Sequence, residues 1–384
     1  MKQEIRKREL VECSQAIANA ARQCKPAVIS AYPITPQTHI VERLAEMVSN
    51  GELNAEFINV ESEHSAMSAT IGASATGART FTASSSQGIA LMHEMLFIAS
   101  GMRLPIVMAV ANRALSAPIN IWNDHSDTMA ERDSGWLQFY CENSQEAYDT
   151  TIMSYIISES KDVMLPSMVC VDGFTLSHLW EPVEFLTDSQ VETFLPSFNP
   201  EFKLEASSPK TFGALAFPST YMQFKKQQQD AMNDSIDAIK KANSDFRKRF
   251  GRGYGDGLIE TYKMEGAKTA LIAMGSVCST SRIVIDKLRK QGKKIGLIKI
   301  KAFRPFPIDE LRKLANGLEG IAVIDRAISP GSYGPLFTEV KSIVNDAKMN
   351  DFIVGLGGRD VNEGMIEGII KKIGQKSEVE WVFD

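Results

Sequence analysis

Short apolar runs alternate with segments of helical periodicity along most of this sequence, and this alternation constrains the fold more than any other feature. In the first half, the apolar runs lie at residues 28–31, 57–60, 81–83, 104–110 and 168–171. Runs that are apolar at every position are typical of strands buried on both faces of a parallel sheet. Each parallel pair needs a crossover connection, usually a helix, which the intervening segments supply. The sequence therefore predicts an α/β fold with doubly wound parallel sheets.

The alternation is interrupted once, in a chain whose 384 residues exceed the usual length of one domain. Scattered prolines and polar residues over 180–226 predict an extended connection, and a polar helix is expected around 228–250. The glycine-rich stretch 251–257 marks a linker, after which strand and helix patterns resume. We therefore predict three parts: a pyrimidine-binding or substrate domain over 1–230, a helix and linker over 231–262, and a second domain over 263–384.

Charge and hydropathy exclude several classes of partner. The net charge is −5 and no basic stripe is present, so nucleic acid is not an expected partner. The chain has no run of about 18 apolar residues and its first residues are charged, so neither a membrane span nor a signal peptide is expected. Together these features predict a cytoplasmic protein.

The cysteines occur singly and far apart. There are five, at positions 13, 24, 141, 170 and 278, and none forms a C-x-x-C pair or lies near a histidine at metal-ligand spacing. An odd, scattered set predicts reduced thiols, as in the cytoplasm. This spacing does not suit a four-cysteine iron–sulfur cluster, so any such cluster is expected on another subunit. No metal ligand is predicted in this chain.

Residues Tyr32-Pro33-Ile34-Thr35-Pro36 follow the first predicted strand. Proline fixes its own φ angle and biases the preceding residue toward extended geometry, so Tyr32 and Thr35 are held rigidly. Thr35 would then display its hydroxyl and a neighbouring backbone N–H at the carboxyl end of a strand, where open α/β sheets bind ligands. The alternative is an ordinary strand-to-helix turn with Pro36 at the first helical position.

This segment and several later ones occur together in one known family. The later motifs are Glu61-Ser62-Glu63, Ala111-Asn112-Arg113-Ala114, Asn123-Asp124-His125-Ser126-Asp127, Asp172-Gly173-Phe174 and Gly355-Leu356-Gly357-Gly358-Arg359-Asp360. In this order, and spread over nearly the whole chain, they resemble the α subunit of 2-oxoacid:ferredoxin oxidoreductases, and most closely that of the pyruvate enzymes. The resemblance implies a pyrimidine-binding domain of the thiamine-enzyme type, followed by a domain similar to the C-terminal domain of transketolase.

Glu63 is the predicted catalytic residue and a predicted cofactor-binding residue. In the family that this chain resembles, a glutamate at this place hydrogen-bonds N1′ of the thiamine aminopyrimidine, and the cofactor acts as the electron sink. Without the resemblance, Glu63 would be interpreted as a first-turn glutamate that offsets a helix dipole. Glu61, two residues away, is interpreted as structural.

The resemblance also implies the substrate contacts. Arg113 follows a buried strand, and its guanidinium can bind a carboxylate through two hydrogen bonds. With Thr35, it is expected to bind the carboxylate and carbonyl region of a 2-oxoacid. Tyr32, Pro33 and Ile34 are expected to contact the cofactor. The alternative for Arg113 is an ion pair at an interface.

A dense polar loop, Asn123-Asp124-His125, is a possible further part of the site. His125 has acidic neighbours and could act as a base, a metal ligand or a hydrogen-bonded loop residue, and a histidine of this kind is most often structural. The resemblance places the loop near the active site and a subunit boundary. No role is assigned to His64, which is next to Glu63. The other histidines are expected on helix faces or as structural hydrogen-bonding groups: His39, His93 and His178.

Gly255-Asp256-Gly257 matches the first half of the signature that binds thiamine diphosphate and its metal ion. The asparagine that completes the signature is absent from the window 281–286, and the triplet lies in a linker, not after a buried strand. We therefore predict an ordinary turn. The diphosphate and its Mg²⁺ are expected on a partner β subunit, so that this chain contacts only the pyrimidine end of thiamine diphosphate.

The predicted function is that of the α subunit of a pyruvate:ferredoxin oxidoreductase, active only in its complex. The resemblance implies reversible oxidative decarboxylation of pyruvate with coenzyme A to acetyl-CoA and CO₂, with reduction of ferredoxin. The expected partners are β, γ and δ-type subunits that carry [4Fe–4S] clusters, and ferredoxin. Two alternatives remain: a 2-oxoisovalerate enzyme with the same catalytic residues, and a non-catalytic assembly subunit.

Overall fold

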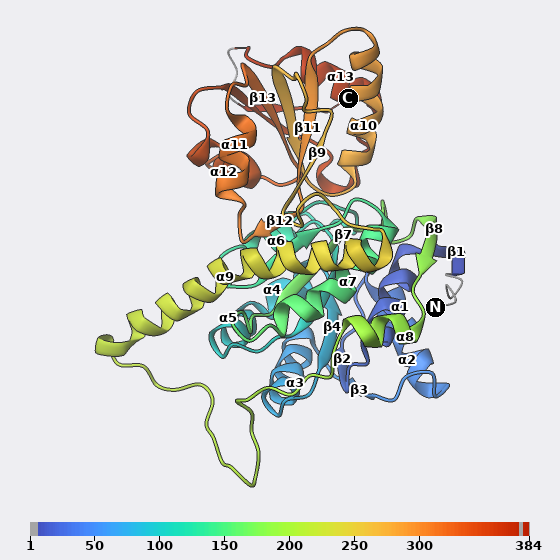
Figure 1. The fold of residues 1–384 in the computed structure, drawn as a ribbon, viewed down its shortest axis with the longest axis vertical. Coiled ribbons are helices and arrows are strands. Elements are labelled where there is room, and N and C mark those ends of the chain that lie inside the picture. The colour runs from blue at the N-terminus through green and yellow to red at the C-terminus, as the bar shows by residue number, and fades with distance from the viewer. Residues whose placement is uncertain (1–6, 376–378, 384) are drawn as a thin grey trace.

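The computed structural model describes residues 7–375 and 379–383 and has two lobes, each built on its own β-sheet (Figure 1). Within the described residues, the N-terminal lobe holds a seven-stranded sheet and the C-terminal lobe a six-stranded one. Both sheets are mainly parallel, and helices cover both faces of each. The predicted α/β class, with two doubly wound domains, is confirmed.

The larger sheet has the strand order β12-β6-β7-β5-β4-β2-β3. Its strands are β2 (Val28–Ala31), β3 (Glu56–Asn59), β4 (Thr80–Ser84), β5 (Val107–Asn112), β6 (Leu137–Tyr140), β7 (Ser167–Asp172) and β12 (Ala302–Arg304). All neighbours are parallel except β12, which runs antiparallel to β6. Because β12 comes from the sequence of the C-terminal lobe, the two lobes interlock through this edge strand.

Strand β5 shows why these strands are apolar at every position. Val107, Ala109 and Ala111 belong to one core cluster, whereas Met108 and Val110 belong to the other. Alternate residues of a strand point to opposite faces, so a strand between two helix layers must be apolar on both. One layer contains α1 (Cys13–Cys24), α2 (Thr38–Ser49) and α7 (Ser144–Ser158). The other contains α3 (Glu63–Ala75), α4 (Ser86–Leu91), α5 (His93–Gly101) and α6 (Ser126–Ala130).

The smaller sheet has the strand order β15-β14-β13-β10-β11-β9. Its strands are β9 (Ile259–Tyr262), β10 (Thr269–Ala273), β11 (Ile295–Ile300), β13 (Gly320–Asp325), β14 (Lys348–Ile353) and β15 (Val379–Trp381). Strand β9 is antiparallel to β11, and the other pairs are parallel. Its helices are α10 (Val277–Lys290) and α13 (Glu363–Lys371) on one face, and α11 (Ile308–Ala315) and α12 (Pro335–Ile343) on the other. The order reverses between β10 and β13, where such sheets open a crevice at their carboxyl ends.

The connection between the lobes is more ordered than the predicted extended chain over 180–226. Strand β8 (Trp180–Phe185) lies in this range and pairs antiparallel with β1 (Lys7–Glu12). Pro182, opposite Leu10, made the strand hard to recognise from sequence. Proline is tolerated at a sheet edge, and both strands of a two-stranded sheet are edges. The expectation of an extended connection was therefore wrong for this part.

The long helix α9 (Pro218–Phe250) also begins earlier than predicted. It follows α8 (Asp188–Phe194) after a segment, 195–217, that has neither helix nor strand. This segment and the start of α9 project from the N-terminal lobe, and the later turns of α9 lie across it (Figure 1). Phe246 and Phe250, near the end of α9, are buried in the core shared with α7. In the described part of the chain, no helix combines the length and apolarity that crossing a membrane requires.

Charged side chains fix how the two lobes meet. Lys299 and Lys301, from the C-terminal lobe, donate hydrogen bonds to Glu146 of α7 at 2.6 and 2.8 Å, and all three side chains are buried. Burial alone would raise the pKa of Glu146, but the two ammonium groups lower it to about 2. Removing either partner of such a pair would leave a buried charge, so the network favours one placement of the lobes.

Candidate active site

The segment 32–36 follows β2 and is held in place by Gln37. The buried amide of Gln37 donates hydrogen bonds to the carbonyl oxygens of Ala83, at 2.7 Å, and Tyr32, at 3.2 Å. Its side-chain oxygen accepts a hydrogen bond from the backbone N–H of Ile34 at 3.4 Å. The prolines are therefore not the only restraint, because a glutamine ties the segment to the end of β4. Sequence reasoning missed Gln37, since its main partner lies on a different strand.

Thr35 and Arg113 lie together at the carboxyl ends of their strands. Arg113 Nη1 donates a hydrogen bond to the carbonyl oxygen of Thr35 at 3.0 Å, and Arg113 Nε donates one to that of Asn120 at 2.9 Å. Nη2 makes no hydrogen bond to any residue that the structure describes. Burial lowers the pKa of Arg113, and the nearby Asp127 acts in the opposite direction. One side of the guanidinium thus holds the backbone, and the other is left for an anion.

Asp127 joins Arg113 to the turn that precedes α4. Its Oδ2 accepts hydrogen bonds from the backbone N–H groups of Arg113, at 2.9 Å, and Ser86, at 3.0 Å. Its Oδ1 accepts one from Asn112 Nδ2 at 2.8 Å. Burial raises the pKa of Asp127 to about 6 in spite of these donors. A fully buried carboxylate that receives several backbone N–H groups is a positioning group, and its sequence neighbours gave no sign of this role.

Glu63 is the first residue of α3 and lies against Gly88 of α4. The helix is capped by Ser62, whose hydroxyl accepts a hydrogen bond from Ser65 N at 3.2 Å. A Cβ atom at Gly88 would lie 2.6 Å from Glu63 Oε1 and 2.5 Å from Ser84 Oγ, so only glycine permits this close approach. Burial raises the pKa of Glu63, and no side chain of a described residue donates a hydrogen bond to it.

The segment 84–88, from the end of β4 into α4, links Glu63 with the Arg113 region. Gly88, at its end, contacts Glu63. Ser85 and Ser86, in its middle, donate hydrogen bonds to the carbonyl oxygens of Ala111 and Ala114 at 2.7 and 2.5 Å. The predicted catalytic acid and the predicted substrate-binding arginine are thus placed on one edge of the sheet by the same short segment.

The predicted cofactor-contacting residues lie at the surface of this edge. Tyr32 is 37% exposed, Pro33 is exposed and Ile34 is half-buried. Ile119 and Trp122, in the loop that receives the Arg113 side chain, are 78% and 51% exposed. Exposed apolar side chains beside a polar site are typical of a surface that another molecule covers. The edge is therefore open to solvent in the single chain.

The loop 123–125 faces the C-terminal lobe. His125 Nε2 lies 2.7 Å from Asp172 Oδ1, and its backbone N–H donates to the carbonyl oxygen of Arg326 at 2.8 Å. The carbonyl oxygen of Asn123 accepts a hydrogen bond from Gly358 N at 2.6 Å, and Asp124 Oδ2 accepts one from Gly357 N at 3.3 Å. His125 is buried at the junction of the lobes, as expected for a structural histidine.

Most other candidates have ordinary structural partners. His64 lies 3.2 Å from Glu94, and His93 lies 2.7 Å from Glu131. Asp256 Oδ1 accepts hydrogen bonds from Leu258 N and Ile259 N, both at 2.9 Å, so Gly255-Asp256-Gly257 forms a turn, as predicted. His39 and His178 approach each other and are considered below.

The larger surface cavities lie away from Glu63, Thr35 and Arg113. Two cavities of about 750 and 790 Å³ lie under the segment 195–217 and are mainly lined by its residues and by α9. Neither is lined by Glu63, Thr35 or Arg113. The site is therefore defined by its polar groups and not by the depth of a pocket.

Comparison with known proteins gives matches over most of the chain. Residues 19–244 match the family described as pyruvate flavodoxin/ferredoxin oxidoreductase, thiamine diphosphate-binding, and residues 267–366 match pyruvate:ferredoxin oxidoreductase core domain II. Pyruvate synthase subunit PorA of Methanocaldococcus jannaschii is 54% identical, over 96% of this chain and 95% of its own length. Ketoisovalerate oxidoreductase subunit VorA of Pyrococcus horikoshii is 44% identical, over 97% of both chains.

Two solved structures resemble the fold. A 2-oxoglutarate:ferredoxin oxidoreductase from Magnetococcus marinus superposes with a TM-score of 0.76 at 18% identity, covering 96% of this chain and 66% of that chain. A split-gene transketolase, described as an inactive β4 tetramer, superposes with a TM-score of 0.55 at 11% identity, covering 95% of this chain and 99% of that one. The fold and the sequence matches agree with the motif resemblance. This chain belongs to the pyruvate flavodoxin/ferredoxin oxidoreductase family.

Proposed function

We propose that this chain is the α subunit of a pyruvate synthase, that is, of a pyruvate:ferredoxin oxidoreductase. The complex would convert pyruvate, coenzyme A and oxidised ferredoxin to acetyl-CoA, CO₂ and reduced ferredoxin, and would also run in reverse. The observation that carries the proposal is the convergence of Glu63, Thr35 and Arg113 on one sheet edge. It occurs in a chain that is 54% identical to a protein named as a pyruvate synthase subunit.

Thr35 and Arg113 would bind the substrate. A 2-oxoacid presents a planar carboxylate, and the free Nη2 edge of Arg113 is a donor suited to it. The side chain reaches this place because two backbone carbonyls, those of Thr35 and Asn120, already orient the guanidinium. Pre-orientation reduces the entropy that binding must overcome. The exposed hydroxyl of Thr35 would then contact the carbonyl group next to the carboxylate.

The residues at this edge fit the pyrimidine end of thiamine diphosphate. Glu63 is a largely buried carboxyl with no side-chain donor among its described neighbours, and its raised pKa suits a group that shares a proton with a ring nitrogen. The absence of a Cβ atom at Gly88 lets α4 approach the Glu63 carboxyl closely. When bound, the cofactor would supply the electron sink for decarboxylation. Glu63 would hold the ring and its proton, with Tyr32, Pro33 and Ile34 beside it.

The rest of the machinery is proposed to lie on partner chains in the cytoplasm. Gly255-Asp256-Gly257 forms a turn, so the diphosphate and Mg²⁺ are assigned to a β subunit. The described cysteines are all buried, and burial raises the pKa of Cys13 and Cys278, for example, which disfavours the thiolates that clusters need. We therefore assign the [4Fe–4S] clusters to γ and δ-type subunits, which would pass electrons to ferredoxin. The division at 1–230, 231–262 and 263–384 is retained as a proposal.

The proposal is tested by purifying the native complex without a tag on this chain. Co-purified subunits, iron, thiamine diphosphate content and coenzyme A-dependent ferredoxin reduction with pyruvate would be measured together. We expect pyruvate to be the preferred substrate by kcat/KM. A complex without thiamine diphosphate, or one inactive with every 2-oxoacid, would refute the assignment.

A second candidate is the ketoisovalerate enzyme, because a protein named as such a subunit is 44% identical over 97% of this chain. Both enzymes would use the same charged residues, and a pocket distinguishes such side chains by only about 1–3 kcal/mol. A higher kcat/KM for 2-oxoisovalerate than for pyruvate, in the same assay, would favour this alternative. Full activity of a Glu63→Gln complex would instead favour a non-catalytic assembly role.

A further inference from the structure

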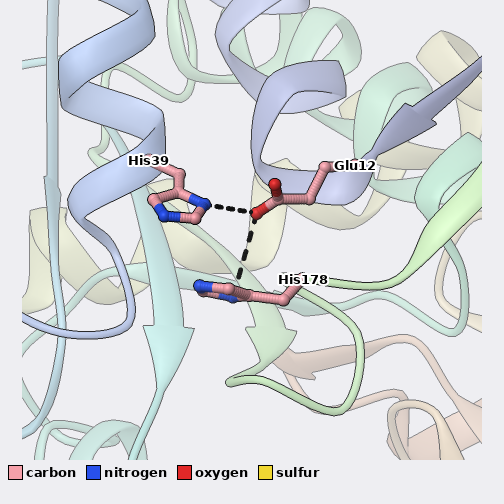
Figure 2. A group of neighbouring side chains, drawn as sticks. All are labelled: Glu12, His39 and His178. Carbon is pink, nitrogen blue, oxygen red and sulfur yellow. Dashed lines mark hydrogen bonds and ion pairs between the residues drawn. The ribbon is translucent and has the colours of Figure 1, made fainter.

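Three side chains from distant segments meet beside the start of α2. Glu12 ends β1, His39 is the second residue of α2, and His178 lies in the turns after β7 (Figure 2). Their candidate ligand atoms all lie within 4.8 Å of one another. Glu12 Oε1 is 2.7 Å from His39 Nδ1 and 3.9 Å from His178 Nδ1. In Figure 2, the lines from one nitrogen of each ring meet at the same carboxylate oxygen.

The chemistry of these three groups matches a zinc site. Two imidazoles and one carboxylate are a ligand set of zinc centres that keep a fourth position for water. Ligand atoms bonded to zinc at about 2.0–2.2 Å in a tetrahedron lie about 3.3–3.6 Å apart. The separations of Glu12 from His39 and from His178, 2.7 and 3.9 Å, lie on either side of this spacing, and all three ligand atoms lie within 4.8 Å of one another, so the side chains would rotate to reach it. Calcium and magnesium prefer sites made of oxygen ligands, which this one is not.

The backbone under the cluster is already fixed without a metal ion. Cys13 N donates a hydrogen bond to Leu179 O at 3.1 Å, and Ser14 N donates one to Ser177 O at 3.0 Å. These bonds join the residues that follow Glu12 to the residues on both sides of His178. A metal site is strong when its ligands are pre-oriented, because less entropy is lost on binding.

The cluster is also accessible, and one ring nitrogen already has a second partner. The side chain of His39 is 45% exposed, that of His178 is 26% exposed and that of Glu12 is 8% exposed. An ion could therefore approach from the His39 side. Ser177 Oγ lies 2.8 Å from His178 Nδ1 and accepts a hydrogen bond from Phe174 N at 2.9 Å. Nδ1 of a neutral imidazole has one lone pair, so an ion bound there would replace the Ser177 contact.

We propose that Glu12, His39 and His178 bind one divalent transition-metal ion of the zinc type, with water completing the coordination. The sequence predicted no metal ligand in this chain, because the three residues have no short-range spacing that would reveal a site. The ion would join β1, α2 and the turn after β7. Since α2 begins directly after Gln37, which holds the segment 32–36, the ion would stabilise the base of the proposed substrate site.

The test is the zinc content of the assembled complex. Wild-type and His39→Asn complexes would be dialysed anaerobically against zinc buffered with nitrilotriacetate, and zinc and iron measured by mass spectrometry. Iron normalises the amount of complex. We expect about one more zinc ion per copy of this chain in the wild type than in the variant, and at least a tenfold weaker affinity in His178→Asn. Equal zinc content in wild type and His39→Asn would overturn the proposal.

A matched control and a second readout make the test specific. His93→Asn removes a comparable exposed histidine that pairs with Glu131 at 2.7 Å without a second imidazole, and it should retain the zinc ion. Loss of the ion in His93→Asn to the same extent would contradict the site. Zinc X-ray absorption should show nitrogen and oxygen ligands at about 2.0–2.1 Å with imidazole scattering, whereas sulfur ligands at about 2.3 Å would refute it. Zinc should raise the unfolding temperature of the wild type and not of His39→Asn, and an equal rise in both would count against the proposal.

Discussion

The two lobes have the same kind of sheet, but their carboxyl-end edges hold polar groups in different ways. In the N-terminal lobe, Glu63 has no side-chain donor among the described residues, and Arg113 keeps one side of its guanidinium free. In the C-terminal lobe, the edge contacts Asp172 of the other lobe. Asp172 accepts hydrogen bonds from Ser276 N at 3.0 Å and from Arg326 Nη1 at 2.9 Å. The first edge is open to a ligand, and the second is closed by protein.

Asp172 therefore takes the place that a ligand anion would have in the C-terminal lobe. It lies at the start of α10 and beside Arg326, which follows β13, close to where the strand order reverses. Arg326 and His125 outweigh burial and lower the pKa of Asp172. The edge at which this type of fold usually binds ligands is thus a contact surface between the lobes here. Function must therefore be argued from the groups at each edge and not from the fold.

The largest expected effect is at the open edge. In the assembled complex, Glu63→Gln should lower kcat for pyruvate oxidation by about 10²–10⁴-fold, because the amide cannot share a proton as the carboxyl does. Protein stability should hold, since burial raises the pKa of Glu63 and the charged form is not favoured by the fold. The matched control is Glu61→Gln, an exposed acid bonded to Ser65, which should retain activity. Full activity of the Glu63→Gln complex would contradict a catalytic role for the edge of the N-terminal lobe.

A substitution at the closed edge should change the stability of the protein. Asp172→Asn should lower the free energy of unfolding by about 3–5 kcal/mol, because Arg326 and His125 lose their buried anionic partner. The pKa of Asp172 lies below its unfolded value of about 3.9, so its contribution is complete above that pH and is lost as the pH falls through the folded pKa. Calorimetry of the complex near neutral pH measures the full contribution, and scans below about pH 3.9 follow its loss.

The control for Asp172 is Asp188→Asn, which breaks an exposed pair with Arg22 and should change stability by about 0–1 kcal/mol. The acid sensitivity of the Asp172→Asn complex should be weaker than that of the wild type. If Asp172→Asn and Asp188→Asn lowered the free energy of unfolding equally, Asp172 would contribute no more than an exposed ion pair does.

Asp127 tests whether the open edge depends on a hidden support. Asp127→Asn should raise the KM for pyruvate about tenfold with little change in kcat, because one amide group cannot accept all the N–H donors around it. In the wild type, this KM should rise as the pH falls through about 6, the pKa of Asp127, and the Asn variant should lose this step. Because the pKa of Asp127 is higher in the folded protein than in the unfolded chain, ionisation of Asp127 lowers the stability of the protein as the pH rises. The carboxylate therefore does not stabilise the fold, and its role is to position the backbone of Arg113.

Initial rates against pyruvate concentration from pH 5 to 8 provide the measurement. Glu131→Gln is the control, because Glu131 is also a buried acid with a raised pKa but pairs with His93 and does not touch Arg113. A fall in kcat at unchanged KM in Asp127→Asn would rule out the positioning role.

The smallest expected effect is at the contact between the edges. Asn120 Nδ2 donates a hydrogen bond to Gly357 O at 3.1 Å, and its backbone carbonyl accepts one from Arg113. Asn120→Ala keeps the carbonyl but loses the bond to Gly357, worth about 1 kcal/mol, and the bond that Asn120 Oδ1 accepts from Trp122 N at 2.7 Å, so the KM for pyruvate should rise about threefold to fivefold. Steady-state kinetics measures it, with Asn19→Ala, far from this loop in the sequence, as control. An unchanged KM would mean that the C-terminal lobe does not support Arg113 through this loop.

Much of the fold could be predicted because burial leaves a short-range pattern. Strand β11 is buried throughout, and β2 has the predicted bounds, 28–31. Strand β8 was missed, since a lone edge pair leaves Trp180 exposed and admits Pro182. Thr35, Glu63 and Arg113 were found through motifs, and their roles stay predictions. The roles of Gln37 and of Asp127, which stands in a quoted motif, could not be predicted, because Ala83, Ser86 and Arg113, their partners, lie far from them along the chain.

Local patterns in the chain thus specified which segments become buried strands and where the charged groups of a thiamine-type site occur along it. Folding alone established that Arg113 reaches the Thr35 carbonyl, that Gly88 lies against Glu63 and that Asp172 closes the other edge. The physical reason is the separation along the chain of the residues that interact. Helix and strand periods are written within a few residues, whereas the free or paired state of a charged group depends on atoms brought from far along the chain.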